Sequence, residues 1–138
     1  MLSRVAENIY WMARYLERAE NTARLIETGQ RIALTRLGDS AAEWRSVLQS
    51  AGVWPAFEGA RREVTKEAAI NWLLRDRGNS SSVYSCICAA RQNARLVRTA
   101  LTGDMWEAIN SAYMNAQENL SRQVAERDLH VSTHLLPA

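Results

Sequence analysis

Residues 3–34 read SRVAENIYWMARYLERAENTARLIETGQRIAL, and their apolar positions recur with the spacing of an amphipathic helix. The steps between successive apolar residues alternate between four and three, as in a heptad seam. The seam consists of Val5, Ile9, Met12, Leu16, Ala19, Ala23 and Ile26. Ser3 is a favourable N-cap and Gly38 a stop signal, whereas Gly29 interrupts the pattern. We therefore expect one long helix from about Ser3 to about Leu34.

Four further segments have helical periodicity. They begin after Asp39 or Ser40, after Thr65, at Val83 and at Asp104, which forms a capping-box-like pair with Glu107. Gly52 and Gly103 are their stop signals, the second after about Leu101. A loop over residues 53–63 and a turn over residues 77–82 separate them, and we expect the two large rings in the loop to pack onto the body. No segment alternates like a strand, so the sequence predicts an all-α bundle of about five helices.

The composition fits one globular domain. The chain has 138 residues, of which 47% are hydrophobic, and only two are prolines. We expect residues 1–138 to form a single helical domain, with residues 128–138 as a loose tail. The net charge of +2 argues against a nucleic-acid-binding protein. All basic residues except Lys66 are arginines, which reflects either a GC-rich genome or partly buried polar networks.

The cysteines and the apolar segments of the sequence indicate the cellular location. Cys86 and Cys88 are two residues apart on a predicted helix, so they point in different directions and cannot pair with each other. Free thiols fit a reducing compartment, and we expect a cytoplasmic protein. No apolar run reaches the roughly 20 residues of a membrane span, and no signal peptide is evident.

The predicted long helix has a second face opposite its seam, which carries charged, aromatic and aliphatic residues together. Its members are Tyr10, Trp11, Arg14, Glu17, Arg18, Asn21 and Leu25. Along the helix surface, Arg14, Asn21 and Arg24 can all approach the carboxylate of Glu17. This arrangement is either a binding surface or a partly buried polar network that sets helix register.

Two segments of the chain are similar to each other. Residues 20–28, ENTARLIET, align with residues 91–99, RQNARLVRT, which places Glu20 opposite Arg91 and Glu27 opposite Arg98. One hypothesis is that the two helices pack together with acidic flanks facing basic flanks. The alternative is that all four charges are solvated.

The first 24 residues, MLSRVAENIYWMARYLERAENTAR, resemble the start of the bacterial alpha-E domain family, which is named for a predicted all-helical domain with a Glu-Arg motif. Residues 80–110 resemble the family's second motif block, although Asn79 is followed by Ser80 where the family has proline. The motif residues carried over are Glu17, Arg18, Asn21, Arg24, Arg91, Asn93, Arg95, Arg98, Trp106 and Asn110. The chain resembles the first half of the family's domain, so we expect a second copy to cover the surfaces left open, giving a homo-oligomer.

The resemblance implies an accessory or partner-binding role beside ATP-grasp ligases or transglutaminase-like proteins that make or modify peptides. The alternative is an enzyme of the same pathway. It would use Glu17 and arginines among Arg24, Arg91, Arg95 and Arg98, gathered in one pocket, as an anion-binding active site.

Other chemistry finds little support in the sequence. No glycine-rich phosphate loop occurs, and we expect no cofactor. His130 and His134 are four residues apart but lie in a weakly helical region, so we expect no metal site. The hydroxyl-rich turn at residues 77–82 is either an anion site or, more simply, a helix cap.

Overall fold

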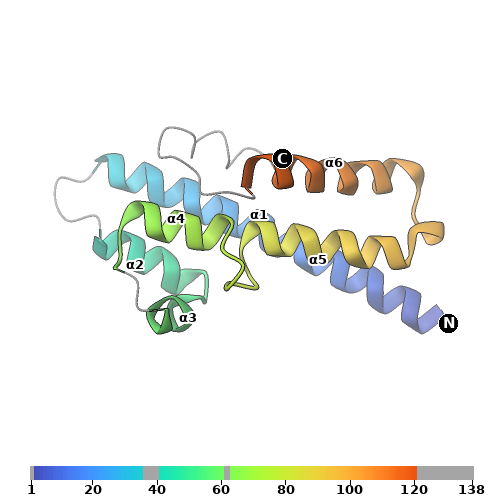
Figure 1. Cartoon of the computed structure of the whole chain (residues 1–138), viewed down its shortest axis with the longest axis horizontal. Helices are drawn as coiled ribbons and strands as arrows, with labels where there is room; N and C mark the ends of the chain where they lie inside the picture. The colour runs from blue at the N-terminus through green and yellow to red at the C-terminus, as the bar shows by residue number, and fades with distance from the viewer. Residues whose placement is uncertain (1, 36–40, 61–62, 121–138) are drawn as a thin grey trace.

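The computed structural model describes residues 2–35, 41–60 and 63–120, and every regular element in these ranges is helical. In chain order the elements are α1 (Leu2–Thr35), α2 (Ala41–Ser50), α3 (Trp54–Gly59), α4 (Lys66–Leu74), α5 (Val83–Leu96), the 3₁₀ turn η1 (Arg98–Ala100) and α6 (Gly103–Leu120), as Figure 1 shows. The prediction of an all-α fold with a long N-terminal helix is confirmed.

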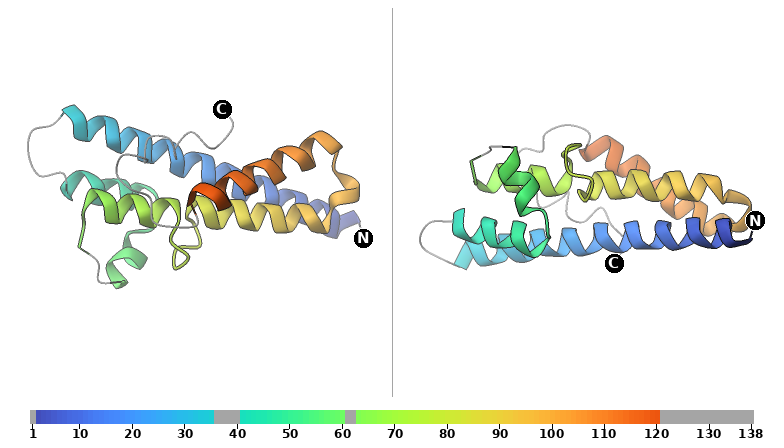
Figure 2. Two further views of the ribbon diagram at one scale, coloured as in Figure 1. Left: turned by 45° about the horizontal axis from the view of Figure 1, so that its top comes forward. Right: turned by 90° about the horizontal axis from the view of Figure 1, so that it is seen from below.

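α1 runs along the length of the molecule, and the other helices pack along it (Figure 1 and Figure 2). α4 and α5 follow one another antiparallel to α1 and form a second, interrupted rod. α6 turns back over α5 near the start of α1, whereas α2 and α3 lie towards the other end. In agreement, α1 packs against α5, α4 and α2, and α6 packs against α5.

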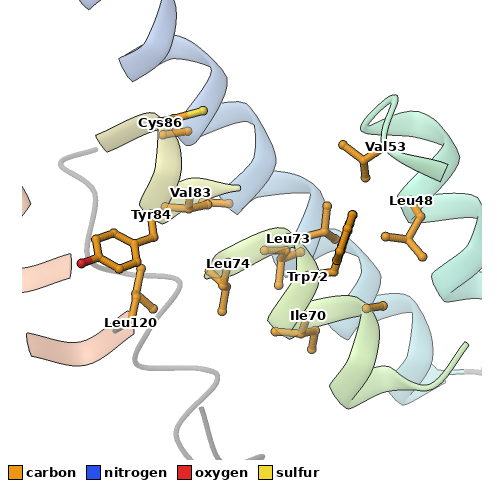
Figure 3. Close-up of a cluster of buried hydrophobic side chains, with 14 of the residues drawn as sticks. Leu48, Val53, Ile70, Trp72, Leu73, Leu74, Val83, Tyr84, Cys86 and Leu120 are labelled. Carbon is orange, nitrogen blue, oxygen red and sulfur yellow. The ribbon is translucent and has the colours of Figure 1, made fainter. Parts of the chain in front are cut away.

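The larger of two buried clusters contains residues of every α-helix from α1 to α6. Figure 3 shows part of it, with Leu48, Leu73 and Val83 among the labelled side chains. From α1 it receives the middle and end of the predicted seam, Ala19, Ala23 and Ile26, which are 0–6% exposed. Each fully buried aliphatic side chain contributes roughly 1.5–3 kcal/mol to stability. The seam is therefore confirmed as the core-facing side of α1.

The smaller cluster lies nearer the start of α1 and connects it to α5 and α6. Its buried members are Met12, Ala90, Ala94 and Ile109. The two alanines of α5 have no side chain beyond Cβ, so the α1 and α5 backbones can approach closely at this level. Together the two clusters account for the tight packing of α1 against α5 and confirm that these helices are partners.

Gly29 interrupts the seam of α1 because α2 crosses the helix there. A Cβ atom on this glycine would lie 2.9 Å from Cγ2 of Val47 and 3.0 Å from the ring of Trp44. Trp44 is fully buried, so its ring has little room to move. The glycine is thus a contact point between α1 and α2.

α2 ends in a Schellman turn at the predicted stop. Gly52 has φ of 74°, in the left-handed region that glycine adopts without strain. Its N–H donates to the carbonyl of Gln49 at 3.0 Å, and the N–H of Val53 donates to the carbonyl of Leu48 at 3.1 Å. This turn places the last residues of α2 against the middle of α1.

The predicted loop over residues 53–63 is wrong in part, because it contains the short helix α3. Pro55 lies in the first turn of α3, where its missing N–H costs nothing. Phe57 is fully buried, stacks on Trp54 at 6.0 Å and meets the edge of Trp72 at 5.7 Å. The expectation that the rings of this segment pack onto the body is therefore confirmed.

The predicted helix from Val83 to about Leu101 is also shorter than expected. α5 ends at Leu96, and the chain tightens into η1 before it reaches Leu101. Val97 still fulfils the apolar pattern, since it is 3% exposed, but it does so from a non-helical conformation. The apolar spacing of a helix thus continued one turn beyond the helix itself.

The cap of α4 agrees with the sequence, whereas those of α6 and α1 differ from it. Thr65 accepts a hydrogen bond from the N–H of Ala68 at 3.1 Å, as expected. α6 is capped by Thr102, which accepts from the N–H of Met105 at 3.2 Å, so Asp104 is a first-turn residue rather than the cap. Ser3 lies inside α1 rather than before it, because α1 begins at Leu2.

Some predictions concern residues outside the described ranges. These are the caps Asp39 and Ser40, the stop at Gly38, the tail over residues 128–138 and the histidines His130 and His134. Among residues 2–35, 41–60 and 63–120, no helix combines the length and apolar character that a transmembrane segment needs.

Candidate binding site

The face of α1 opposite the seam borders a cavity of about 220 Å³. The α1 residues that line it are Arg14, Glu17, Arg18, Asn21, Thr22 and Leu25, and Ser50 and Ala51 line it from the end of α2. Four predicted site residues, Arg14, Glu17, Arg18 and Asn21, are thus brought together. The sequence pattern did not reveal Ser50 and Ala51, because it carries no signal for where α2 stops relative to α1.

The two arginines of the cavity differ in their partners. A guanidinium nitrogen of Arg14 lies 3.6 Å from a carboxylate oxygen of Glu17, and the two side chains are 49% and 59% exposed. Such an exposed pair contributes at most about 1 kcal/mol. Arg18 is half-buried, lies 5.8 Å from the centre of the Tyr15 ring, and forms no ion pair with another described residue. Its charge remains available to a ligand.

Arg18 also lies close to the start of α5. Burial raises the pKa of the Cys86 thiol from 9.0 to about 11, and the positive charge of Arg18 offsets part of this rise. Cys86 is fully buried and does not line the cavity. The positive charge of Arg18 therefore acts on a buried group of α5, while its ring contact is with Tyr15 on its own helix.

The outer face of α1 continues beyond the cavity as an aromatic surface. Tyr10 and Trp11 are 55% and 41% exposed, and their rings meet edge to face at 5.4 Å. Trp11 also lies 6.1 Å from Tyr15, whose ring is next to Arg18. We call the residues Tyr10, Trp11, Arg14, Glu17, Arg18 and Asn21 the outer face of α1. Large exposed rings beside charged groups are typical of interaction surfaces.

Arg24 does not take part in this cavity. Its guanidinium pairs with Glu20, four residues earlier on α1, rather than with Glu17. The predicted approach of Arg24 to the Glu17 carboxylate is therefore wrong. Glu20 lies at the competing i,i+4 spacing, which favours its pairing with Arg24.

The candidate arginines later in the chain serve a different purpose, because Arg91 of α5 and Arg98 of η1 contact α6. Nε of Arg91 donates to Oδ1 of Asn110 at 3.1 Å, and its guanidinium lies 4.2 Å from the centre of the Tyr113 ring. The guanidinium of Arg98 lies 4.7 Å from the centre of the Trp106 ring. Trp106 and Asn110, which the motif block contains, are thus the structural partners of Arg98 and Arg91.

The other two α5 candidates stay on their own helix or face outward. The amide of Asn93 donates to the carbonyl of Ala89 at 3.0 Å, and Arg95 is exposed. None of Arg24, Arg91, Arg95 and Arg98 lines the cavity beside Glu17. The pocket that the enzyme hypothesis required, with Glu17 among these arginines, is not formed there.

The similarity between residues 20–28 and 91–99 predicted the packing correctly but not the partners of the arginines. α1 and α5 do pack together. Arg91 and Arg98 contact residues of α6, however, and Glu20 pairs within α1. A residue on the flank of a helix can turn to either neighbour, and here the rings and amide of α6 are the nearer partners.

A second hollow, of about 310 Å³, lies at the start of α5 and was not predicted. Arg77, Tyr84, Ser85 and Cys88 line it. Burial is the largest cause that raises the pKa of the Cys88 thiol and of the Tyr84 phenol. At the adjacent helix start, Ser82 accepts from the N–H of Ser85 at 3.1 Å, so the capping interpretation of this turn is confirmed.

The part of the chain that the structure describes contains neither a metal-binding cluster nor a disulfide bond. No three His, Cys, Asp or Glu side chains come together there in a metal-binding arrangement. Cys86 and Cys88 are both free thiols, as their spacing predicted.

The long first helix and its interrupted antiparallel companion define an all-helical domain, and the outer face of α1 borders its cavity. A family model matches residues 1–136, and the family is Alpha-E, described as a predicted alpha-helical domain with a conserved ER motif. The chain belongs to the Alpha-E family. In the described ranges its single Glu-Arg pair is Glu17-Arg18, at the cavity. Neither the comparison with curated proteins nor that with solved structures gave a match.

Proposed function

We propose that the chain is a helical accessory domain that binds a partner protein or its peptide substrate through the outer face of α1. The observation that carries this proposal is that the rings and charged groups of that face are at least partly exposed to solvent. It combines exposed rings at Tyr10 and Trp11 with the cavity at Arg18, whereas Arg91 of α5 and Arg98 of η1 contact side chains of α6. Aromatic and arginine side chains together carry much of the binding energy in protein interfaces.

The partner that we propose is an ATP-grasp ligase, or a transglutaminase-like protein, that makes or modifies peptides in a bacterial cell. This choice follows from the family resemblance of the Glu17-Arg18 helix. The two free thiols support a reducing, cytoplasmic setting for the complex.

We also propose that the chain forms a homo-oligomer. Among the residues that the structure describes, four large hydrophobic side chains besides Tyr10 and Trp11 are exposed, Leu34, Leu96, Met105 and Met114. Association would cover part of this apolar surface. Light scattering coupled to size-exclusion chromatography at several concentrations tests the proposal, and a monomer mass throughout would contradict it.

The test of the partner-binding role is co-purification with an ATP-grasp ligase from the same organism. Trp11→Ser and Glu17→Arg change the outer face of α1 without touching a buried side chain, so both variants should fold and should lose most of the captured ligase. Arg95→Gln changes an exposed arginine of α5 and is the matched control. Equal capture by all variants would contradict the role assigned to α1, and no capture by the unchanged chain would contradict the choice of partner.

A further inference from the structure

The cavity on α1 combines charged, polar and apolar groups from two helices. α1 contributes the guanidinium groups of Arg14 and Arg18, and the end of α2 contributes Ser50 and Ala51. The carbonyls of Leu48 and Gln49 already accept hydrogen bonds in the Schellman turn, so the Ser50 hydroxyl is the polar group that α2 offers. A ligand of this cavity therefore meets positive charge from α1 and a neutral hydrogen-bonding group from α2.

Arg18 is the residue that an anionic group of a ligand would contact. Arg14 shares its charge with Glu17 at 3.6 Å, whereas Arg18 forms no ion pair with another described residue and is held beside the Tyr15 ring. A guanidinium group offers two parallel N–H donors, which match the two oxygens of a carboxylate. Because Arg18 is half-buried, this bond would be less screened by water than one at a fully exposed arginine.

The size and lining of the cavity restrict what else the ligand carries. Its volume of about 220 Å³ lies below the roughly 300–1,000 Å³ of pockets for drug-sized molecules. Leu25 and Ala51 supply apolar contact, while Asn21, Thr22 and Ser50 supply groups that hydrogen-bond to amides. One or two residues at a chain end fit this description.

We propose that this cavity binds the C-terminal end of a peptide, with the α-carboxylate on Arg18. The last side chain then packs against Leu25 and Ala51, and backbone N–H groups reach the side-chain oxygens of Asn21 and Ser50. This inference rests on the proposed function, since it names the ligand class of the same face. Glu17 acts indirectly. It pairs with Arg14, and its negative charge disfavours the entry of a second carboxylate into the cavity.

The test uses N-terminally labelled tetrapeptide pools of mixed sequence without acidic side chains, prepared as free acids and as C-terminal amides. Fluorescence anisotropy with the whole chain measures affinity, and the amide signals of Asn21 in NMR spectra report on the cavity directly. A charge-assisted bidentate bond predicts that the free acids bind about tenfold more tightly than the amides, or better. A third pool of C-terminal amides with one glutamate tests a side-chain carboxylate as the source.

Variants separate the carboxylate contact from a general effect of charge. Arg18→Gln should weaken binding of the free acids about tenfold. Ser50→Glu should also weaken it, because it adds a negative charge to the cavity, and Arg95→Gln should leave it unchanged. Ser50→Glu changes an exposed side chain, so it remains informative if Arg18→Gln fails to fold.

Equal binding of acids and amides, or no binding by any pool, would overturn the proposal. So would unchanged affinity in a folded Arg18→Gln variant, or equal binding of the glutamate pool. Failure of ligase capture with intact peptide binding would contradict the proposed partner but not this inference. Intact ligase capture without peptide binding would support the partner-binding role and contradict the peptide C-terminus as the ligand of the cavity.

Discussion

The guanidinium of Arg98 lies 4.7 Å from the centre of the Trp106 ring, across the turn that joins α5 to α6. Arg91, seven residues earlier in the chain, makes the equivalent contact with Tyr113 at 4.2 Å. Arg91 of α5 and Arg98 of η1 therefore contact α6 through ring faces rather than through carboxylates. This relationship accounts for the two arginines before the turn and the tryptophan and asparagine after it in this chain.

Arg98→Ala should lower the free energy of unfolding by about 0.5–1 kcal/mol, the range for an exposed cation–π contact. A double-mutant cycle with Trp106→Leu, measured by urea unfolding, should give a coupling energy of the same size. Arg95→Ala, at an exposed neighbour, should change stability by less than about 0.5 kcal/mol. Strict additivity of the Arg98 and Trp106 changes would show that the contact contributes nothing.

Gly29→Ala should destabilise the fold even though alanine favours helices. The added Cβ would lie 2.9 Å from Val47 and 3.0 Å from the Trp44 ring, and such overpacking costs about 1–3 kcal/mol. This exceeds the gain of about 0.5–1 kcal/mol from replacing a helical glycine. Gly103→Ala, where nothing lies within 4 Å of the new atom, is the matched control and should not destabilise through a clash. Thermal unfolding of both variants decides between the two effects.

Ser82→Ala should lower stability by about 1 kcal/mol, because it removes the side-chain cap of α5. The Ser82 hydroxyl is fully buried and also donates to the hydroxyl of Ser85 at 2.8 Å, so the loss could reach about 2 kcal/mol. Ser80→Ala, at an exposed position of the same turn, serves as the comparison. Equal midpoints of urea unfolding for the two variants would mean that Ser82 is not the cap.

Stability should fall at high pH because Cys86 is buried as a neutral thiol. Its pKa is about 11 in the folded chain, against 9.0 as the ordinary value. The contribution is therefore complete below pH 9 and is lost as pH rises towards 11, where the unfolded chain ionises first. Urea unfolding between pH 8 and pH 11 measures the slope, and Cys86→Ala should reduce it. An unchanged slope in this variant would assign the effect to other groups.

The sequence contains strong information about α1 and weaker information about the segments that follow it. Steps of four and three define the seam of α1 without reference to any other helix, so its length and buried side could be predicted. The same kind of spacing continued through Val97 and Leu101 after α5 had ended, because burial selects apolar residues whatever the local backbone. α3 was missed because six residues are too few for a periodic pattern.

The candidate site was predictable on α1 and not beyond it. The angular position of Arg14, Glu17, Arg18 and Asn21 on one helix follows from helix geometry alone, and the structure places all four at the cavity. The partners of Arg91 and Arg98 depend on which of two neighbours each side chain turns towards. That choice is set by the ring positions on α6, and the spacing of residues along α5 contains no information about it.

The molecule contains two kinds of attractive contact that respond differently to salt. One is the ion pair between exposed side chains, and the other is the contact of Arg91 and Arg98 with aromatic rings. Dissolved ions screen attractions between exposed opposite charges, such as Arg14 and Glu17, within roughly 10 Å at 0.1 M. A guanidinium packed on a ring, with a neutral amide as its second partner, has no opposing charge to be screened in this way. Concentrated sodium chloride should therefore release a charged ligand from α1 while α6 stays attached, which offers a mild route to eluting bound partners from an intact domain.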